Sequence, residues 1–218
     1  MNRALIIAHG QPSDPGPAAA EIAVLASKVQ DHLPGWEVRS VTLAEAAALQ
    51  DAVSGTGLVY PLFMAGGWFT QVHLPQRLRD AGGEGWRILP PFGTDPAIEA
   101  LTLDLARGAG RPILLAAHGS FRSKAPSQIA HDICEKIGAM GIPARAAFID
   151  QQPQIAEVAA AMPDAACLPF FAARGGHVIE DLPKGLAAGG FRGPLMNPVG
   201  LHPSVPGIIA AALDRVKV

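Results

Sequence analysis

The sequence has few cysteines, few charged residues and no long apolar run, and each scarcity excludes a class of protein. Its two cysteines, Cys134 and Cys167, lie far apart and form no CxxC pair, which argues against a disulfide scaffold or a zinc–thiolate site. Charged residues make up 17% of the chain and the formal net charge is -2. No basic cluster occurs, so nucleic acid is not an expected partner.

Two further absences concern cellular location. No apolar stretch approaches the length of a membrane span. The first residues include an apolar run only from Ala4 to Ala8, and no cleavage-type segment follows it, so they do not resemble a signal peptide. We therefore expect a cytoplasmic protein with no membrane partner.

Apolar residues, in contrast, are plentiful, at 49% of 218 positions. This content is sufficient for one large domain or for two small domains that share an interface. An internal repeat favours two domains. Four segments of the first half resemble four of the second, in the same order: residues 4–10 and 113–119, 61–68 and 169–177, 74–75 and 182–183, and 91–96 and 198–203.

The repeat has a nearly constant spacing. His9 and His118 are 109 positions apart, Pro61 and Pro169 are 108 apart, and the glycine pairs that follow these prolines are again 109 apart. A one-residue difference between the copies is therefore expected in this loop. The glycine-rich stretch at 107–111 is the natural boundary, which predicts lobes at 1–108 and 111–218.

Each half alternates short apolar runs with amphipathic segments, a pattern typical of α/β folds. In the second half, Ile129, Ile133 and Ile137 recur every four residues, as on one face of a helix. Strands are predicted near 4–8, 37–43, 57–64, 87–92, 112–117, 144–149, 166–171 and 194–199, and second-half helices near 125–140, 153–162, 178–186 and 203–216. We expect two homologous, doubly wound lobes, each with a four-stranded parallel sheet, facing each other across a cleft.

Polar residues follow the predicted strands of the second half. His118 and Asp150 come directly after the first two of these strands, and His177 and His202 lie in the segments that follow the third and fourth. Ligands of doubly wound sheets bind beyond the carboxyl ends of the strands. Imidazoles are common ligands of cobalt, iron and nickel, and a nearby carboxylate orients an imidazole or takes up a proton. The pattern predicts a metal site at His118 and His177, with Asp150 as a further catalytic residue.

The first half lacks most of this set. His9 is retained, but the repeat places Trp68 opposite His177, Ala44 opposite Asp150 and Asp95 opposite His202. The chemistry is therefore expected in the second lobe. Trp68, together with Phe69 and Met64, would offer an apolar face to a planar ligand.

Four motifs resemble the class II chelatases, most closely the sirohydrochlorin cobaltochelatase family: AHGS at 117–120, AFID at 147–150, PFFAARGGHVIEDLP at 169–183 and GLHP at 200–203. The resemblance implies a lyase-class enzyme that inserts a divalent metal (Co²⁺, or Fe²⁺ or Ni²⁺) into sirohydrochlorin or a related tetrapyrrole in cobalamin or siroheme synthesis. The metal is a substrate, no organic cofactor is implied, and the family's two histidines correspond to His118 and His177. Asp150 stands where related enzymes have glutamate.

Contacts with the tetrapyrrole are expected from His9, Trp68, Ser120, Arg174, Gly175 and Gly176. An arginine fork suits the substrate's carboxylates, a role open also to Arg122 or Lys124. The adjacent glycines would let a flat ligand approach the backbone closely.

Structural explanations for the same residues remain open. His118 would then only end its strand, and Asp150 and His202 would cap the helices that follow them. Two other functions are also compatible with the fold. One is a metal- or tetrapyrrole-binding carrier without turnover. The other is a nucleotide-binding protein, but no GxGxxG or Walker A motif follows either first strand.

Overall fold

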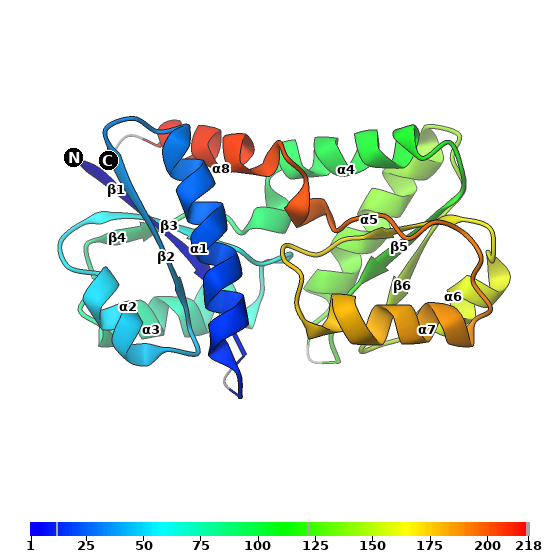
Figure 1. The fold of residues 1–218 in the computed structure, drawn as a ribbon, viewed down its shortest axis with the longest axis horizontal. Coiled ribbons are helices and arrows are strands. Elements are labelled where there is room, and N and C mark those ends of the chain that lie inside the picture. Colours follow the sequence, from blue (N-terminus) through cyan, green and yellow to red (C-terminus); the bar gives the residue numbers. More distant parts are fainter. Residues whose placement is uncertain (12, 122, 217–218) are drawn as a thin grey trace. The chain divides into compact units, whose positions relative to one another are not determined.

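The computed structural model describes residues 1–11, 13–121 and 123–216 and contains two parallel sheets flanked by helices (Figure 1). The strand orders are β2-β1-β3-β4 and β6-β5-β7. In both sheets the chain crosses from one side of the first strand to the other, as in a doubly wound fold. The predicted α/β class with parallel sheets is confirmed.

The expected fourth strand of the second sheet is wrong. Residues 194–199 form no named strand, and only an isolated bridge joins Leu195 to Cys167. Pro194 and Pro198 have no N–H group to donate to a ladder, which limits pairing to this single bridge.

The first sheet and its helices come from the N-terminal half. Their bounds are β1 Asn2–Ala8, α1 Pro15–Asp31, β2 Trp36–Thr42, α2 Ala46–Ala52, β3 Gly57–Pro61, η1 Phe69–His73, α3 Leu74–Asp80, β4 Trp86–Ile88, η2 Phe92–Thr94 and α4 Pro96–Gly108. The C-terminal half follows the same order. It contains β5 Ile113–Ala117, α5 Ala125–Ala139, β6 Ala144–Phe148, α6 Ile155–Ala161, β7 Ala166–Pro169, η3 His177–Asp181, α7 Leu182–Ala188, η4 Val199–Leu201 and α8 Val205–Asp214.

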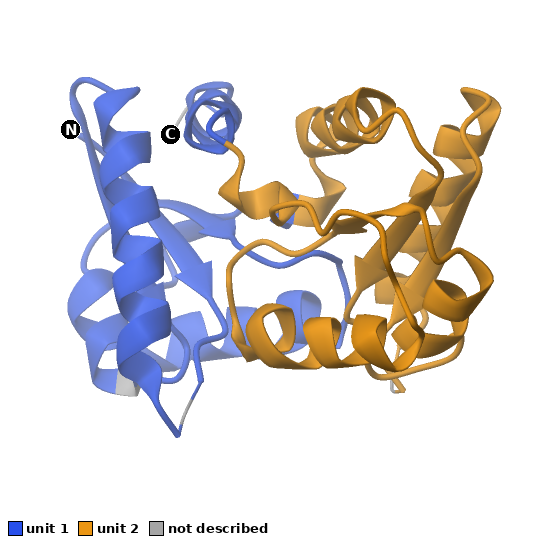
Figure 2. Ribbon diagram, turned by 45° about the vertical axis from the view of Figure 1, so that its right-hand side comes forward, with its two compact units in different colours: residues 1–92, 203–218 blue, residues 93–202 orange. Residues whose placement is uncertain are grey.

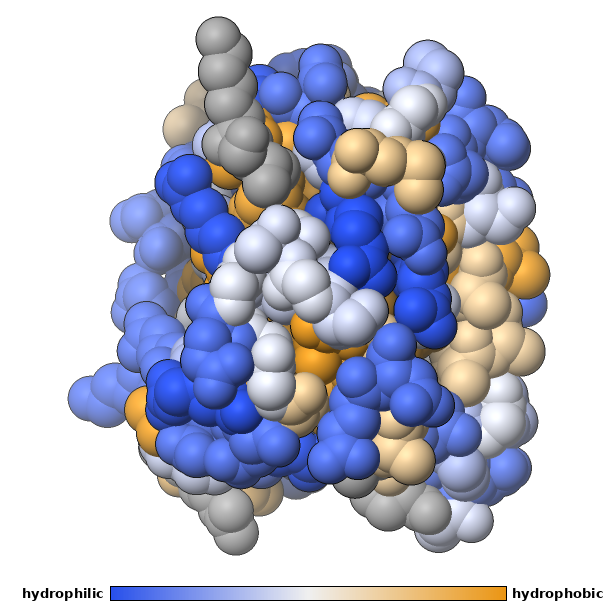
Figure 3. Space-filling model, turned by 90° about the vertical axis from the view of Figure 1, so that its left-hand side faces the viewer, coloured by the Kyte–Doolittle hydropathy of each residue, from blue (hydrophilic) through white to orange (hydrophobic). Residues whose placement is uncertain are grey.

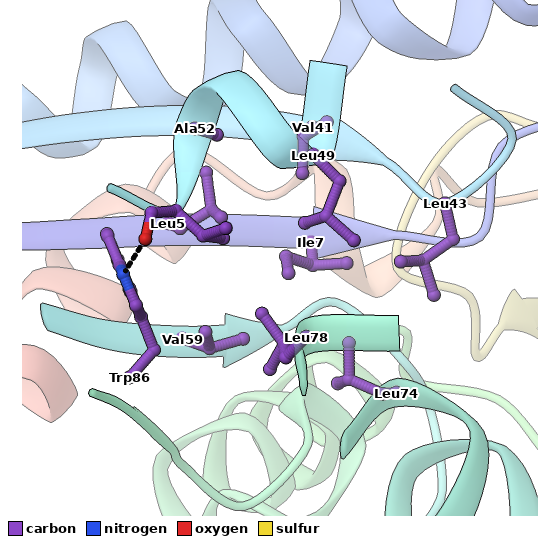
Figure 4. Close-up of a cluster of buried hydrophobic side chains, with 11 residues drawn as sticks. Leu5, Ile7, Val41, Leu43, Leu49, Ala52, Val59, Leu74, Leu78 and Trp86 are labelled. Carbon is purple, nitrogen blue, oxygen red and sulfur yellow. Dashed lines mark hydrogen bonds between the residues drawn. The ribbon is translucent and has the colours of Figure 1, made fainter. Parts of the chain in front are cut away.

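The central strands are continuous apolar runs because helices cover both faces of each sheet. In β1, Leu5 and Ile7 are fully buried and pack with Val59 of β3 and Leu74 of α3 (Figure 4). At the edge of this cluster the indole N–H of Trp86 donates a 2.9 Å hydrogen bond to the carbonyl of Val53. The second sheet has a matching cluster, which includes Leu114, Ala116, Cys167, Leu182 and Leu186.

The compact units do not coincide with the sequence repeats. One unit comprises residues 1–92 and 203–218, and the other residues 93–202 (Figure 2). The last helix of the first repeat, α4, packs on α5, whereas the last helix of the second repeat, α8, packs on α1. The two repeats thus exchange their C-terminal helices, which a division at 1–108 and 111–218 does not capture.

Figure 3 shows one face of the molecule, on which hydrophilic residues predominate and apolar atoms appear between them. Among the described residues, no helix combines the length and apolar character that crossing a membrane requires.

Candidate metal site

His118 lies on a turn that requires glycine at the next position. The turn follows β5, and Gly119 has a φ of +73°. A Cβ on Gly119 would lie 2.6 Å from Cγ of Gln151. The same glutamine accepts a 2.8 Å hydrogen bond from the backbone N–H of Ser120. The tight turn leaves the His118 imidazole half-exposed at the carboxyl end of the sheet.

His177 begins a helix of unusual geometry. Residues His177–Asp181 form a single π-helical turn that continues directly into α7. Turns of this kind are rare in proteins overall, and those that occur are often found at functional sites. The preceding Gly175 and Gly176 are exposed, and a Cβ at either position would have no neighbour within 4 Å. The approach to His177 is therefore open on this side, as expected for a site that admits a flat ligand.

The structure brings the two predicted metal ligands together within the second unit. Nε2 of His118 lies 3.1 Å from Nε2 of His177, and the ring planes are perpendicular. Their side chains are 43% and 47% exposed, so a ligand can reach both. Two nitrogens that share a tetrahedral metal at bond lengths of about 2.0–2.1 Å stand roughly 3.3 Å apart. The observed spacing is close to that value.

The opposite nitrogens of both rings face oxygen atoms. Nδ1 of His118 is 3.0 Å from the carbonyl oxygen of Gly119 and 3.4 Å from Oδ2 of Asp150. Nδ1 of His177 is 2.7 Å from Oδ2 of Asp181. Acceptors on the Nδ1 side favour a proton there and leave Nε2 of each ring without one. Such a pair is suited to binding a proton or a metal cation between the rings.

Asp150 approaches His118 from behind the metal-facing nitrogen. Its carboxylate lies 3.4 Å from Nδ1 of the ring, farther than the Gly119 carbonyl oxygen at 3.0 Å. The alternative role as a helix cap is wrong, because α6 begins later, with Gln154 at the N-cap and its N–H bonded to the carboxylate of Glu157. His202 does not cap α8 either: Ser204 occupies that N-cap, and His202 ends the short helix η4.

Sequence reasoning missed Asp181, the residue in closest contact with either imidazole. A signal was present, because the HVIED segment places a histidine and an aspartate four positions apart, the spacing of side chains that meet on a helix. The sequence pattern predicts an ordinary helix near 178–186, whereas the structure has a π-helical turn at His177–Asp181. The π-helical turn aligns the two side chains.

The other expected substrate-binding residues surround the imidazoles less closely. Ser120 uses its hydroxyl to accept a 3.2 Å hydrogen bond from the N–H of Ser123, which orders the loop after His118. Arg174 and Lys124 are exposed, the former three positions before His177 and the latter at the beginning of α5. Arg122 lies outside the described residues.

The equivalent site of the first unit contains Phe69, not Trp68, at the position of His177. The backbone bonds establish the correspondence: Gln71 N–H donates to Gly67 O, as Ile179 N–H donates to Gly175 O, at a spacing of 108. The π-helical turns Phe69–His73 and His177–Asp181 begin at these residues. The sequence predicts that this loop differs by one residue between the two copies. That prediction is wrong, because only the glycine pairs occupy different positions in the two loops, while the backbone hydrogen bonds keep a spacing of 108.

The match of Ala44 to Asp150 holds. The N–H of Ala44 donates to the carbonyl of His9 at 3.1 Å, and that of Asp150 donates to the carbonyl of His118 at 3.0 Å. Asp95, matched to His202, instead caps α4 by accepting a 2.9 Å bond from the N–H of Ala97.

The first unit therefore presents a cluster of aromatic rings where the second has the His118–His177 pair and its two carboxylates. His9 stacks on Phe69 with ring centroids 4.7 Å apart. Trp68 stacks on His73 at 5.4 Å, and Phe63 packs against Phe69 at 5.1 Å. The Trp68 side chain is well exposed, at 64%. We refer to these five residues as the ring cluster.

Two observations limit where chemistry can occur. Burial raises the pKa of Cys134 and of Cys167 to about 12, which keeps both thiols protonated and disfavours metal binding through thiolates. Leaving aside residues 12, 122, 217 and 218, no group of three or more His, Cys, Asp or Glu side chains is arranged to hold a metal ion. The His118–His177 pair is thus a two-nitrogen site with space for further ligands.

Comparison with known proteins identifies the family of this chain. A sequence model of the CbiX family matches residues 112–216, the part that contains both imidazoles. A solved CbiX, described as the terminal enzyme of siroheme biosynthesis in denitrifying bacteria, is 42% identical over 100% of both chains, with a TM-score of 0.91. The chain belongs to the CbiX family of class II chelatases.

More distant structures share the fold. SirB from Bacillus subtilis with Fe³⁺ is 17% identical, with a TM-score of 0.71 over 99% of this chain and 95% of SirB. The sirohydrochlorin chelatase SirB of Bacillus subtilis subspecies spizizenii, in complex with cobalt, is also 17% identical, with a TM-score of 0.73 and the same coverage. No curated protein matches the chain.

Proposed function

We propose that this CbiX-family protein inserts a divalent metal ion into sirohydrochlorin, and that His118 and His177 hold the ion before transfer. The observation that carries the proposal is the 3.1 Å separation of the two Nε2 atoms on an exposed edge of the second sheet. Membership of the CbiX family supports the substrate, since the 42% identical relative acts in siroheme biosynthesis.

Metal insertion exchanges one divalent cation for two protons of the macrocycle's inner nitrogens. As the metal leaves, each Nε2 lone pair becomes available to accept one of these protons, so the same pair serves first as ligand and then as base. Asp150 and Asp181, on the Nδ1 sides, balance the positive charge that the imidazoles acquire. Release of both protons to water restores the starting state.

Substrate contacts follow from the residues around the pair. The open backbone at Gly175 and Gly176 allows a macrocycle to lie close to His177. Arg174, Lys124 and the Ser120 loop offer positive charge and hydrogen bonds to the carboxylates of the ring.

In the first unit, the ring cluster supplies an exposed aromatic surface, and we assign Trp68 and His9 to stacking against the tetrapyrrole.

We propose Co²⁺ or Fe²⁺ as the metal. Both ions accept imidazole ligands, and availability decides between them as much as affinity. Solved SirB structures with Fe³⁺ and with cobalt support this choice.

The test is to assay insertion of Co²⁺ and of Fe²⁺ side by side, following the absorption change of sirohydrochlorin. His177→Ala and His118→Ala should abolish insertion and leave the circular dichroism spectrum unchanged. His32→Ala is the matched control, because this exposed histidine ends α1 and lies outside the site. Near-normal turnover by His177→Ala would refute the assignment. Stoichiometric binding without acceleration by the wild type would identify a carrier instead.

A further inference from the structure

We infer that Asp181 is a positioning residue for metal binding: it fixes the tautomer and the direction of the His177 ring. The inference rests on the proposed function, in which His118 and His177 bind the metal. It adds a third residue, Asp181, which orients one of these two ligands. Three observations within the chain support it.

The first is the contact itself. Oδ2 of Asp181 lies 2.7 Å from Nδ1 of His177, the shortest distance from either imidazole to an oxygen. A carboxylate can only accept from a ring nitrogen, so this contact places a proton on Nδ1 and frees the Nε2 lone pair. A neutral imidazole in the other tautomer would point an N–H at the incoming metal.

The second is the local backbone. His177 and Asp181 are the first and last residues of the π-helical turn, and Leu182, fully buried, anchors the turn to the core. The two side chains are nonetheless 47% and 46% exposed. About half of the His177 side chain is therefore without packing neighbours, and the hydrogen bond to Asp181 adds to the contacts that hold the ring.

The third is an internal comparison. His9 of the first unit keeps its 2.9 Å contact between Nδ1 and the carbonyl of Gly10, as His118 keeps its contact with Gly119. That contact belongs to the turn, because it persists where the partner imidazole is absent. The His177–Asp181 pair, in contrast, is replaced at both positions, by Phe69 and His73. At these two matched positions, the carboxylate accompanies the imidazole of His177, and the unit with Phe69 in place of that imidazole lacks it.

The experiment compares Asp181→Ala, Asp181→Asn and Asp181→Glu with the wild type. Glu180→Gln is the matched control: it removes an adjacent exposed carboxylate that faces Lys184 at 3.8 Å and does not contact the imidazoles. Co²⁺ binding is titrated without tetrapyrrole, and steady-state assays give separate KM values for Co²⁺ and sirohydrochlorin. Long-range ¹H–¹⁵N spectra report the tautomer of His177.

Loss of a carboxylate that orients a metal-binding histidine costs about 10–100-fold in metal affinity. We expect Asp181→Ala and Asp181→Asn to raise the Kd and KM for Co²⁺ by this factor, with the KM for sirohydrochlorin changed less than about twofold. Asp181→Glu should recover part of the affinity, and Glu180→Gln should match the wild type. In the spectra, His177 should shift from the Nδ1-protonated form toward a mixture when Asp181 is replaced.

An unchanged Kd for Co²⁺ and an unchanged tautomer in Asp181→Ala would overturn the inference. An equal rise in both KM values, accompanied by a lower Tm, would also overturn it, because that pattern indicates general damage to the fold. Failure of the proposed function would give a different result from failure of this inference. If His177 does not bind the metal, the wild type and His177→Ala would bind Co²⁺ with the same affinity. The tautomer spectrum would still show whether Asp181 determines the tautomer of His177.

Discussion

Rebuilding the metal site in the first unit would test whether the repeat correspondence is right. The changes are Phe69→His, His73→Asp and Ala44→Asp, which reproduce His177, Asp181 and Asp150 at matched backbone positions. His9 already occupies the position of His118. Its ring centroid lies 4.7 Å from that of Phe69, against 4.5 Å between His118 and His177. The imidazole introduced at position 69 would therefore stand at nearly the native spacing.

The expected result is a second equivalent of bound Co²⁺ per chain. Affinity at the new site should depend on the carboxylate, so a variant with Phe69→His alone should bind about 10–100-fold more weakly than one that also has His73→Asp. The His9 ring must turn, because it now lies at 25° to Phe69 whereas the native imidazoles are perpendicular.

The changes also remove aromatic contacts in the ring cluster. Phe69 packs with Phe63, Trp68 and His73. Aromatic pairs contribute about 0.5–1.5 kcal/mol each, so losing these three contacts should cost roughly 1.5–4.5 kcal/mol. For a chain of this size that lowers Tm by about 3–18 °C.

The assay is calorimetric titration with Co²⁺ at 20 °C, together with a thermal melt. Adding His9→Ala to the triple variant should return the stoichiometry to one. A folded triple variant that still binds one equivalent of Co²⁺ per chain would refute the correspondence of Phe69 to His177. It would also refute the reasoning that the first unit lacks a metal site only because it lacks the side chains introduced at positions 69, 73 and 44.

Three further predictions follow from local geometry and burial. Gly119→Ala forces a side chain into a φ of +73° with a Cβ 2.6 Å from Gln151, so it should destabilise the fold by about 1–3 kcal/mol in urea unfolding, whereas Gly138→Ala, in open space on α5, should stabilise it by up to about 1 kcal/mol. Burial in the folded chain raises the pKa of Cys134 and of Cys167 from 9.0 to about 12, so between pH 9 and 12 only the unfolded chain releases these protons. The free energy of unfolding should therefore decrease, as the pH rises through this range, by about 1.4 kcal/mol per thiol per pH unit. Replacing both cysteines with alanine should flatten that slope, and an equally steep slope would contradict the assignment. Trp68→Ala should raise the KM for sirohydrochlorin several-fold with kcat unchanged, and an unchanged KM would remove Trp68 from the substrate surface.

Much of the site was accessible from the sequence. The repeat, together with apolar runs ending in polar residues, was enough to predict parallel sheets and to place His118, Asp150 and His177 at one edge of the second sheet. This works because successive parallel strands end at the same edge, so residues distant in the chain converge there without any knowledge of side-chain packing.

Other features depended on contacts that no local pattern encodes. The residues 194–199 form an apolar run, yet two prolines reduce it to one bridge. The glycine pairs suggested that Trp68 stands opposite His177, but backbone hydrogen bonds assign that place to Phe69. The exchange of α4 and α8 between the repeats was likewise not predictable, since the apolar residues of each helix indicate that one face is buried but not which helix covers it.

The sequence by itself determined the class of fold, the repeat and the edge at which two histidines meet, because these follow from periodicity and from the direction of the strands. Only the tertiary structure decided that the two Nε2 atoms lie 3.1 Å apart and that Asp181 holds one ring from behind. The His177 ring is contacted through a π-helical turn and one hydrogen bond, and the turn leads directly into Leu182, which is buried in the core by residues distant in the chain.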